Sequence, residues 1–425
     1  MPRQPAVTKS GRKPANRAAS QASNILEKLK SLPSLLATDA QAAAFRQIVG
    51  QIQDLSFDAA EKIVTSAAAP EMIRIIDATV ASPRGKKFAE PVLFALKILG
   101  YFGTQEGTEV IIRTAAGGFA PTAYSWSVVL GVFGEGHPGA KMLFAALAKK
   151  LPEKFLGISV LDAANTACRE HSLKNHPFDS KEGVVRLSKL LGNLKSNQAS
   201  YAVSACAAIP FLSAARRRPL VALARKHKNV AIRLEIAWAT AKLSDKAGLE
   251  YLVSMCMDPN YSMQARTYLK ELKQATRIPK KARNPDFAAL SEMCQWLAHP
   301  HEFGQPPTSI APLDKRSIYW PPAGRTHTLR LFKYEYAKSL TFPTREVGVG
   351  MVGSVTFALF GETKPDMKPE DIYGIHCCWE LEIAGDPRAP KKRSGKAGWK
   401  LIEAGTRASP RLSRPQRTTR KTSPN

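Results

Sequence analysis

The sequence predicts a mainly α-helical protein, an α-solenoid of helical hairpins followed by a small antiparallel β-sheet module. Between Asn229 and Lys273, apolar residues recur at the i, i+3, i+4, i+7 spacing of amphipathic helices. The motif LGYFG at residues 99–103 returns as LGVFG at residues 130–134, an interval of 31 residues (130 minus 99) that suits one helical hairpin per repeat. After residue 300 the apolar period becomes alternating, which favours strands.

Length and composition set the frame for these elements. A chain of 425 residues with 44% hydrophobic residues is long enough for two or three domains with sizeable cores. Its six cysteines show no regular spacing, which is typical of buried apolar residues in a reducing compartment. Residues 1–22 lack the apolar core of a signal peptide, and the uncharged stretch 196–215 is too polar for a membrane span. We therefore expect a cytoplasmic protein with no membrane segment.

We expect the helical array to span residues 23–298. Ser23 and Asn24 are typical N-cap residues that would open its first helix. In the stretch 229–273, an apolar helix and a shorter amphipathic helix precede a return of the pattern, and Arg233 and Arg266 stand 33 residues apart (266 minus 233). This arrangement resembles HEAT-type repeats, in particular the short repeats of the phycobilisome-lyase-like families. The resemblance implies a surface for partners and no catalytic residue, and it implies that the two arginines tie neighbouring repeats together.

The C-terminal part is expected to differ in kind. Residues 299–325 are rich in proline and predict a linker. Residues 326–404 predict a small antiparallel β module with strands at 327–336, 349–360, 372–383 and 399–402, because these runs are rich in β-branched and aromatic residues. In the first run, Leu329 and Leu331 alternate with Phe332 and Tyr334, so the two sets should lie on opposite faces of the sheet.

Positive charge is the strongest compositional signal, with a formal net charge of +27. More than half of it falls in residues 1–22, 386–398 and 405–425, which are too poor in apolar residues to form a core. We expect all three segments to be disordered, with residues 1–22 and 405–425 as the two terminal arms. Such arms attract polyanions by releasing counterions from phosphate, or they only keep the protein in solution. Both interpretations stay open at this stage.

A second set of cations falls inside the predicted helical array, where it could form a basic ridge for nucleic acid or for an acidic partner. Its triple-arginine run is expected in a turn between two helices, and the alternative is an ordinary solvated face. The members of the set are Arg216, Arg217, Arg218, Arg225, Lys226, Lys228, Lys280, Lys281 and Arg283.

Three motifs resemble catalytic or binding sites without the context that such sites need. Gly348, Gly350 and Gly353 form a literal G-x-G-x-x-G, but a strand-like run follows where a nucleotide site needs a helix, so we interpret them as close-approach glycines. His376 and Cys378 lack the spacing of a closed zinc site. His176 precedes a proline in an inter-helix loop, where a histidine is usually solvated. We expect no cofactor and no metal.

The sequence thus favours a non-enzymatic binding or scaffold protein that docks a protein partner through its helical surface. One alternative is sequence-tolerant binding of nucleic acid through the arms and the basic ridge. A third hypothesis is a HEAT-like enzyme, such as a DNA glycosylase or a bilin lyase. Trp238, Trp296, Asp245 and Asp258 are the aromatic and carboxylate types that base extrusion requires, but they stand in no motif of either family.

Overall fold

The computed structural model describes residues 13–56, 61–192, 199–299, 301–339 and 342–408. This part of the chain is mainly α-helical, with seventeen α-helices and a four-stranded antiparallel sheet near its C-terminal end, as the sequence predicts. None of its helices combines the length and the apolar character that crossing a membrane requires. The chain divides into two compact units, Met1–Asp245 and Lys246–Asn425, which are described separately.

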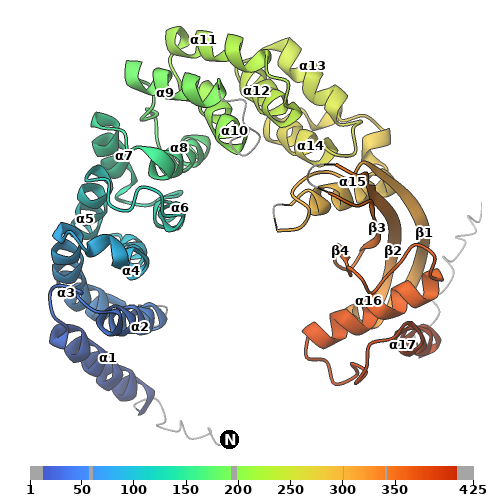
Figure 1. The fold of residues 1–425 in the computed structure, drawn as a ribbon, viewed down its shortest axis with the longest axis horizontal. Helices are drawn as coiled ribbons and strands as arrows, with labels where there is room; N and C mark the ends of the chain where they lie inside the picture. Colours follow the sequence, from blue (N-terminus) through green and yellow to red (C-terminus); the bar gives the residue numbers. More distant parts are fainter. Residues whose placement is uncertain (1–12, 57–60, 193–198, 300, 340–341, 409–425) are drawn as a thin grey trace, which may run out of the picture. The chain divides into compact units, whose positions relative to one another are not determined.

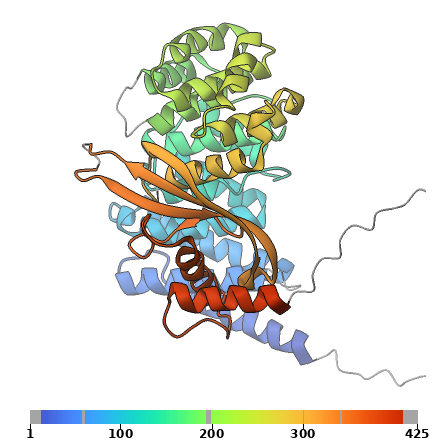
Figure 2. The same ribbon diagram turned by 90° about the vertical axis from the view of Figure 1, so that its right-hand side faces the viewer.

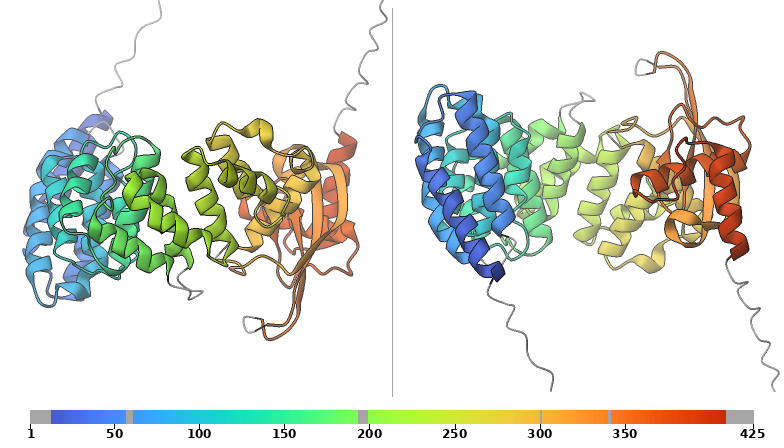
Figure 3. Two further views of the ribbon diagram at one scale, coloured as in Figure 1. Left: turned by 90° about the horizontal axis from the view of Figure 1, so that it is seen from above. Right: turned by 90° about the horizontal axis from the view of Figure 1, so that it is seen from below.

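Unit 1 consists of helices in two rows, and helices of one row alternate along the chain with those of the other. Helices of the same row pack on one another in chain order, as Figures 1 and 3 show for this unit. One row contains α2 (Asp39–Ser56), α4 (Ala89–Phe102), α6 (Ser125–Leu130), α8 (Lys154–Arg169), α10 (Ala199–Ala208) and α12 (Val230–Lys242). The other contains α1 (Lys13–Ser31), α3 (Glu61–Ala81), α5 (Gln105–Ala116), α7 (Ala140–Lys149), α9 (Lys181–Leu191) and α11 (Ala214–Arg225).

The 31-residue repeat extends over three helices of the first row. Leu99 of α4, Leu130 of α6 and Leu161 of α8 follow one another at this interval and are almost completely buried. Gly103 ends α4 in the left-handed conformation, with φ of 64°. Each hairpin therefore buries an equivalent leucine against the next, which is the packing of a helical repeat.

Unit 2 begins with α13 (Lys246–Met255) and α14 (Ser262–Glu271), and an antiparallel sheet in the order β1-β2-β3-β4 follows. Arg266 of α14 donates hydrogen bonds to the carbonyl oxygens of Ser262 and Ala282, which fits the structural role implied for it. The remaining elements are α15 (Pro285–Leu297), β1 (Ser309–Trp320), β2 (Arg325–Tyr336), β3 (Glu346–Val352), β4 (Phe357–Ala358), α16 (Pro369–Ile383) and α17 (Gly395–Ala408).

The sheet lies between α15 on one face and α16 with α17 on the other (Figures 1 and 2). Leu329 and Leu331 of β2 belong to the cluster with α16, whereas Phe332 and Tyr334 belong to the cluster with α15. This confirms the alternation predicted for β2. The two apolar faces of one sheet are thus both covered by helices.

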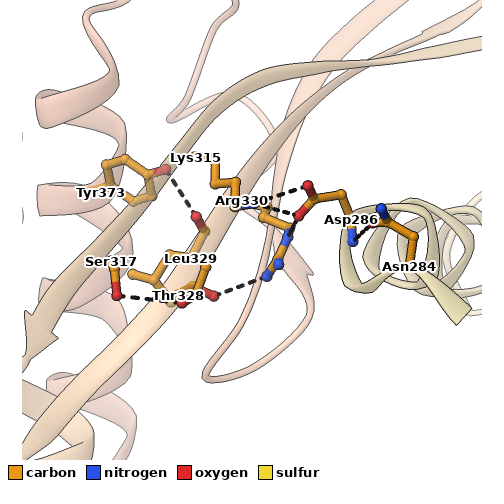
Figure 4. A network of polar contacts seen from close by, with 8 residues as sticks. All are labelled: Asn284, Asp286, Lys315, Ser317, Thr328, Leu329, Arg330 and Tyr373. Atoms are coloured by element: carbon orange, nitrogen blue, oxygen red, sulfur yellow. Dashed lines mark hydrogen bonds and ion pairs between the residues drawn. The ribbon is translucent and has the colours of Figure 1, made fainter. Parts of the chain in front are cut away.

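A polar network fixes α15 to the sheet (Figure 4). The side chain of Asn284 caps the helix by accepting a hydrogen bond from the backbone N–H of Asp286. Asp286 in turn forms ion pairs of 2.8 Å with Lys315 of β1 and with Arg330 of β2. Hydrogen bonds from Lys315 and Arg330 hold the pKa of Asp286 below its ordinary value. The carboxylate therefore joins the start of the helix to two neighbouring strands.

Two predicted strands are helices in the structure. Residues 372–383 belong to α16 and residues 399–402 to α17. All residues of the first run from Ile372 to Cys378 are buried. Because apolar residues face nearly all sides of this helix, the sequence shows no alternation of apolar and polar residues with a helical period. Its helix signals were Pro369 at the start and two acidic residues in the first turn.

The boundaries of the predicted segments also differ from the structure. The predicted linker 299–325 contains β1, and Pro312 lies at an irregularity of this edge strand, where the missing backbone donor is tolerated. In the predicted arms, residues 13–22 belong to α1 and 405–408 to α17, while 1–12 and 409–425 lie outside the described residues. Disorder of residues 386–398 was a wrong expectation, because Asp386 pairs with Arg388 and residues 395–398 begin α17.

Helices α16 and α17 cross at a contact that only glycine permits. A Cβ atom on Gly374 would lie 2.0 Å from the carbonyl oxygen of Gly395. A Cβ atom on Gly398 would lie 1.9 Å from the carbonyl oxygen of Gly374. The two backbones are therefore in direct contact, and any side chain would push the helices apart.

Two ionisable groups of α16 are buried in unit 2. His376 has no exposed surface, and neither ring nitrogen has a hydrogen-bond partner among the described residues. Burial lowers the pKa of His376 to about 3. Glu380 accepts a hydrogen bond of 2.9 Å from the indole of Trp320, and burial raises the pKa of its carboxyl group. Both environments disfavour the charged form.

We predict that Gly374→Ala destabilises unit 2 by about 3 kcal/mol, since overpacking without room to relax costs this much. Denaturant unfolding of the full chain measures the change. The control is Gly50→Ala in α2, where the nearest atom to a new Cβ is 3.8 Å away and alanine should add roughly 0.5–1 kcal/mol through its helix propensity. Equal stability of Gly374→Ala and the parent would contradict the close crossing.

We also predict that unit 2 loses stability in acid because of His376. In the unfolded chain His376 takes up a proton near pH 6.5, whereas in the folded protein it does so only near pH 3. The contribution of neutral His376 to the free energy of unfolding is therefore complete above pH 6.5 and is lost as the pH falls toward 3. The loss at pH 5 is about 2 kcal/mol.

Replacing His376 by Leu should remove this part of the acid sensitivity, while the same change at the exposed His301 should leave it in place. Thermal unfolding at pH 7.5 and pH 5 measures both. An unchanged acid response in His376→Leu would show that other groups cause it.

A basic, aromatic-lined groove as the candidate functional site

A groove in unit 1 has a volume of about 600 Å³, within the range of ligand-binding clefts. It lies where the loop before α6, the start of α8, the second half of α9 and the start of α10 meet. Its lining combines aromatic rings with cations. The lining residues are Thr122, Tyr124, Pro152, Glu153, Lys154, Phe155, Gly157, Ile158, Phe178, Arg186, Lys189, Leu190 and Tyr201.

Three of the four aromatic residues that line the groove come from one row of helices. Tyr124 directly precedes α6, Phe155 is the second residue of α8, and Tyr201 is the third residue of α10. These helices are neighbours in one row, and their starts lie at the same edge of the array. The ring centroids of Tyr124 and Phe155 are 4.3 Å apart, and those of Phe155 and Tyr201 are 6.4 Å apart. We call these three residues the aromatic ladder.

Cations stand beside the aromatic ladder. Lys154 and Lys189 are exposed, and the half-buried Arg186 completes the set. Arg186 donates a hydrogen bond of 2.5 Å to the carbonyl oxygen of Pro152 and pairs with Glu182 at 2.6 Å. Its guanidinium group therefore holds the start of α8 against α9. The two lysines supply the accessible positive charge of the groove. Glu153 is its single acidic residue, so the groove carries a net positive charge.

A buried histidine positions the groove wall. His176 accepts a hydrogen bond of 3.2 Å at Nδ1 from the backbone N–H of Phe178, which leaves Nε2–H to donate to Asn165 at 3.0 Å. Asn165 also donates to the carbonyl oxygen of Ser204 in α10. Burial lowers the pKa of His176 to about 3, against the opposing charge of Asp179. The expectation of a solvated His176 was therefore wrong, because its loop folds inward between α8 and α10.

Lys154 has an unusual backbone for a residue with a side chain, with φ of 53°. This left-handed conformation costs an L-residue roughly 1–2 kcal/mol. The strain occurs where the chain leaves the loop after α7 and enters α8, next to Phe155 of the aromatic ladder. It places the amino group of Lys154 in the lining of the groove.

The predicted basic ridge is divided by the structure. The triple arginine lies in the first turn of α11, not in a turn between helices, because the helix begins five residues before Pro219. Arg216 pairs with Asp179 at 3.1 Å, Arg217 reaches the carbonyl oxygen of Leu212, and Arg218 is exposed. Three cations at a helix N-terminus oppose the helix dipole, so the Asp179 pair has a structural role.

The other predicted cations fall into two groups. Arg225 pairs with Asp245, whereas Lys226 and Lys228 are exposed in the connection between α11 and α12. Lys280, Lys281 and Arg283 belong to unit 2. There Arg283 donates hydrogen bonds to the carbonyl oxygens of Ile278 and Thr276, and the two lysines are exposed.

The motifs considered for catalysis have structural explanations. Added Cβ atoms on Gly348, Gly350 and Gly353 would contact Tyr334, Met293 and Leu329, so these glycines are close-approach positions in and after β3, as interpreted from the sequence. His376 and Cys378 lie in a helix and not in a strand. No group of three or more His, Cys, Asp or Glu suited to a metal ion occurs in the described ranges. All six cysteines are buried, and burial raises the pKa of Cys168 and Cys256 to about 11.

The residues of the enzyme hypothesis fall in both units. Trp238 is completely buried in α12, so its ring is not accessible to an extruded base. Asp245 is paired with Arg225. Trp296 and Asp258 belong to unit 2.

The aromatic ladder was missed by the sequence reasoning, although one signal was present. Tyr124 and Phe155 are 31 residues apart (155 minus 124), the interval of the leucine repeat. Tyr201 follows after 46 residues (201 minus 155), mainly because α8 has 16 residues whereas α6 has 6. Comparison of the chain with protein-family models, curated proteins and solved structures gives no significant match. The geometry of this groove and its charge therefore carry the functional argument.

We predict that Lys154→Gly stabilises unit 1 by about 1 kcal/mol, since glycine adopts positive φ without strain. The control is Lys28→Gly at an exposed position inside α1, which should cost roughly 0.5–1 kcal/mol. Chemical denaturation compares the two variants. A loss of stability in Lys154→Gly similar to that of the control would mean that the backbone at this position is not strained.

Proposed function

We propose that the protein is a non-enzymatic binding protein whose unit 1 binds nucleic acid without reading its sequence. One observation carries the proposal. Residues 174–233 contain twelve lysines and arginines but only two acidic residues before Glu235, Asp179 and Glu182. Each of these two acids is paired with an arginine. The positive charge of this region therefore greatly exceeds what its own acids neutralise.

The exposed members of this set lie on neighbouring elements of unit 1. Lys181 and Lys189 are on α9, Arg218 is on α11, and α9 packs on α11. Lys226 and Lys228 extend the set into the next connection. Clustered cations on adjacent helices are the electrostatic signature of a phosphate-binding surface.

Such a surface binds by displacing counterions from phosphates, so affinity should fall steeply with salt and depend little on base sequence. The proposal includes the HEAT-type assignment of the array, which the two rows and the 31-residue leucine repeat support. It favours nucleic acid over a protein partner, because an extended polyanion matches a charge excess spread over several helices. Docking of a protein partner remains a prediction, and capture from native cells with and without nuclease separates the two.

We predict that Arg218→Ser, Lys226→Ser and Lys228→Ser combined weaken binding and lower the salt slope by up to about three, one for each phosphate that is no longer neutralised. Arg216 is left unchanged because it pairs with Asp179. Folding should be preserved, since exposed substitutions usually change stability by less than about 0.5 kcal/mol each. Titration of a fluorescent oligonucleotide at several salt concentrations measures the slope.

The matched control removes the same charge elsewhere in unit 1, with Lys28, Lys86 and Lys141 all changed to Ser. It should retain more affinity and a steeper slope than the first variant. Equal reductions in the two triple variants would place the binding surface outside α11 and the connection that follows it. No binding by the parent protein at low salt would reject the proposal.

A further inference from the structure

We infer that the groove of unit 1 holds a single-stranded segment of nucleic acid, with bases against the aromatic ladder and phosphates beside Lys154 and Lys189. This inference rests on the proposed function and names the form of nucleic acid that the groove accepts. It follows from ring geometry, from the position of the cations and from the accessibility of the groove.

Tyr124 has the most open ring of the aromatic ladder, whereas Phe155 and Tyr201 are half-buried. Tyr124 and Phe155 are tilted by 57° and touch at a centroid distance of 4.3 Å, and Phe155 and Tyr201 meet edge to face at 60°. The contact with Phe155 covers only part of the Tyr124 ring, and the rest of that ring is open to a ligand. Tyr124 is 73% exposed, an unusual state for an aromatic residue in a packed repeat. Flat heterocycles stack on such rings regardless of their identity.

The cations lie beside the rings, as this mode of binding requires. Lys154 directly precedes Phe155, and Lys189 lines the same groove from α9. A nucleotide chain alternates a flat base with a charged phosphate, and the groove combines rings with ammonium groups. An apolar peptide would use the rings and leave the lysines unpartnered, so charge complementarity favours the nucleotide.

The same geometry disfavours a duplex. The bases of a duplex are stacked on each other, and only their edges are open in the grooves. Rings in a concave site can reach base faces only when the strand is unpaired. The basic surface of α9 and α11 would bind both forms through phosphate, whereas the aromatic ladder would add affinity for single strands alone.

Tyr124→Ala tests the inference with two labelled probes, a mixed-sequence strand of about 12 nucleotides and its duplex. Fluorescence anisotropy should show single-strand affinity reduced roughly 5- to 100-fold, the usual effect of removing one stacking ring, and duplex affinity unchanged. Tyr124→Phe, which keeps the ring, should bind like the parent. Tyr101→Ala is the control, because Tyr101 is also exposed, at 58%, but lies at the end of α4 outside the groove.

Four results would overturn the inference. Unchanged single-strand binding by Tyr124→Ala, while the parent binds both probes, would reject the aromatic ladder but keep the proposed function. Equal reductions for strand and duplex would show binding through phosphate without stacking. Displacement of the strand by a poly-glutamate peptide whose own binding needs Tyr124 would assign the groove to an acidic protein segment. If the parent binds neither probe, the proposed function fails and this inference with it.

Discussion

The structure of unit 1 depends on one constraint, which is that a single helical hairpin cannot bury its apolar face alone. Leu99, Leu130 and Leu161 meet this constraint at a constant interval, and each is buried against the neighbouring hairpin. Equivalent positions therefore line up along the row. The aromatic ladder is a consequence, because Tyr124 and Phe155 stand at equivalent places before and in successive helices of the row. The periodic burial of leucines in the core thus also spaces these aromatic residues regularly on the surface.

Electrostatics divides the cations of unit 1 into two kinds. Arg216 and Arg225 are engaged by Asp179 and Asp245, and Arg186 by Glu182, so these arginines hold elements together. Planar guanidinium groups suit such bonds, because they donate in fixed directions to carboxylates and carbonyl oxygens. The exposed lysines, among them Lys189 and Lys226, are flexible point charges. They are suited to a phosphate chain whose exact position varies, which agrees with the proposed sequence tolerance.

In unit 2, glycines allow neighbouring helices and strands to pack with their backbones unusually close. Glycines let α16 cross α17 with backbone in contact, and Gly350 makes room for Met293 of α15 against the sheet. The close packing of α16 also buries His376, whose ring nitrogens have no hydrogen-bond partners among the described residues. Burial lowers the pKa of His376, so the ring stays neutral. A glycine pattern that resembles a nucleotide motif in the sequence therefore serves packing, because a strand and not a loop before a helix carries it.

The sequence by itself determined the fold class, the repeat interval and the two faces of β2, because each depends on local periodicity. It did not determine α16, since a helix buried on nearly all sides shows no period, or β1, since an edge strand tolerates proline. It named the basic residues but not which of them pair with acids. Only the tertiary structure brought Tyr124, Phe155 and Tyr201 into one groove, because row packing joins residues that are 31 and 46 positions apart in the chain.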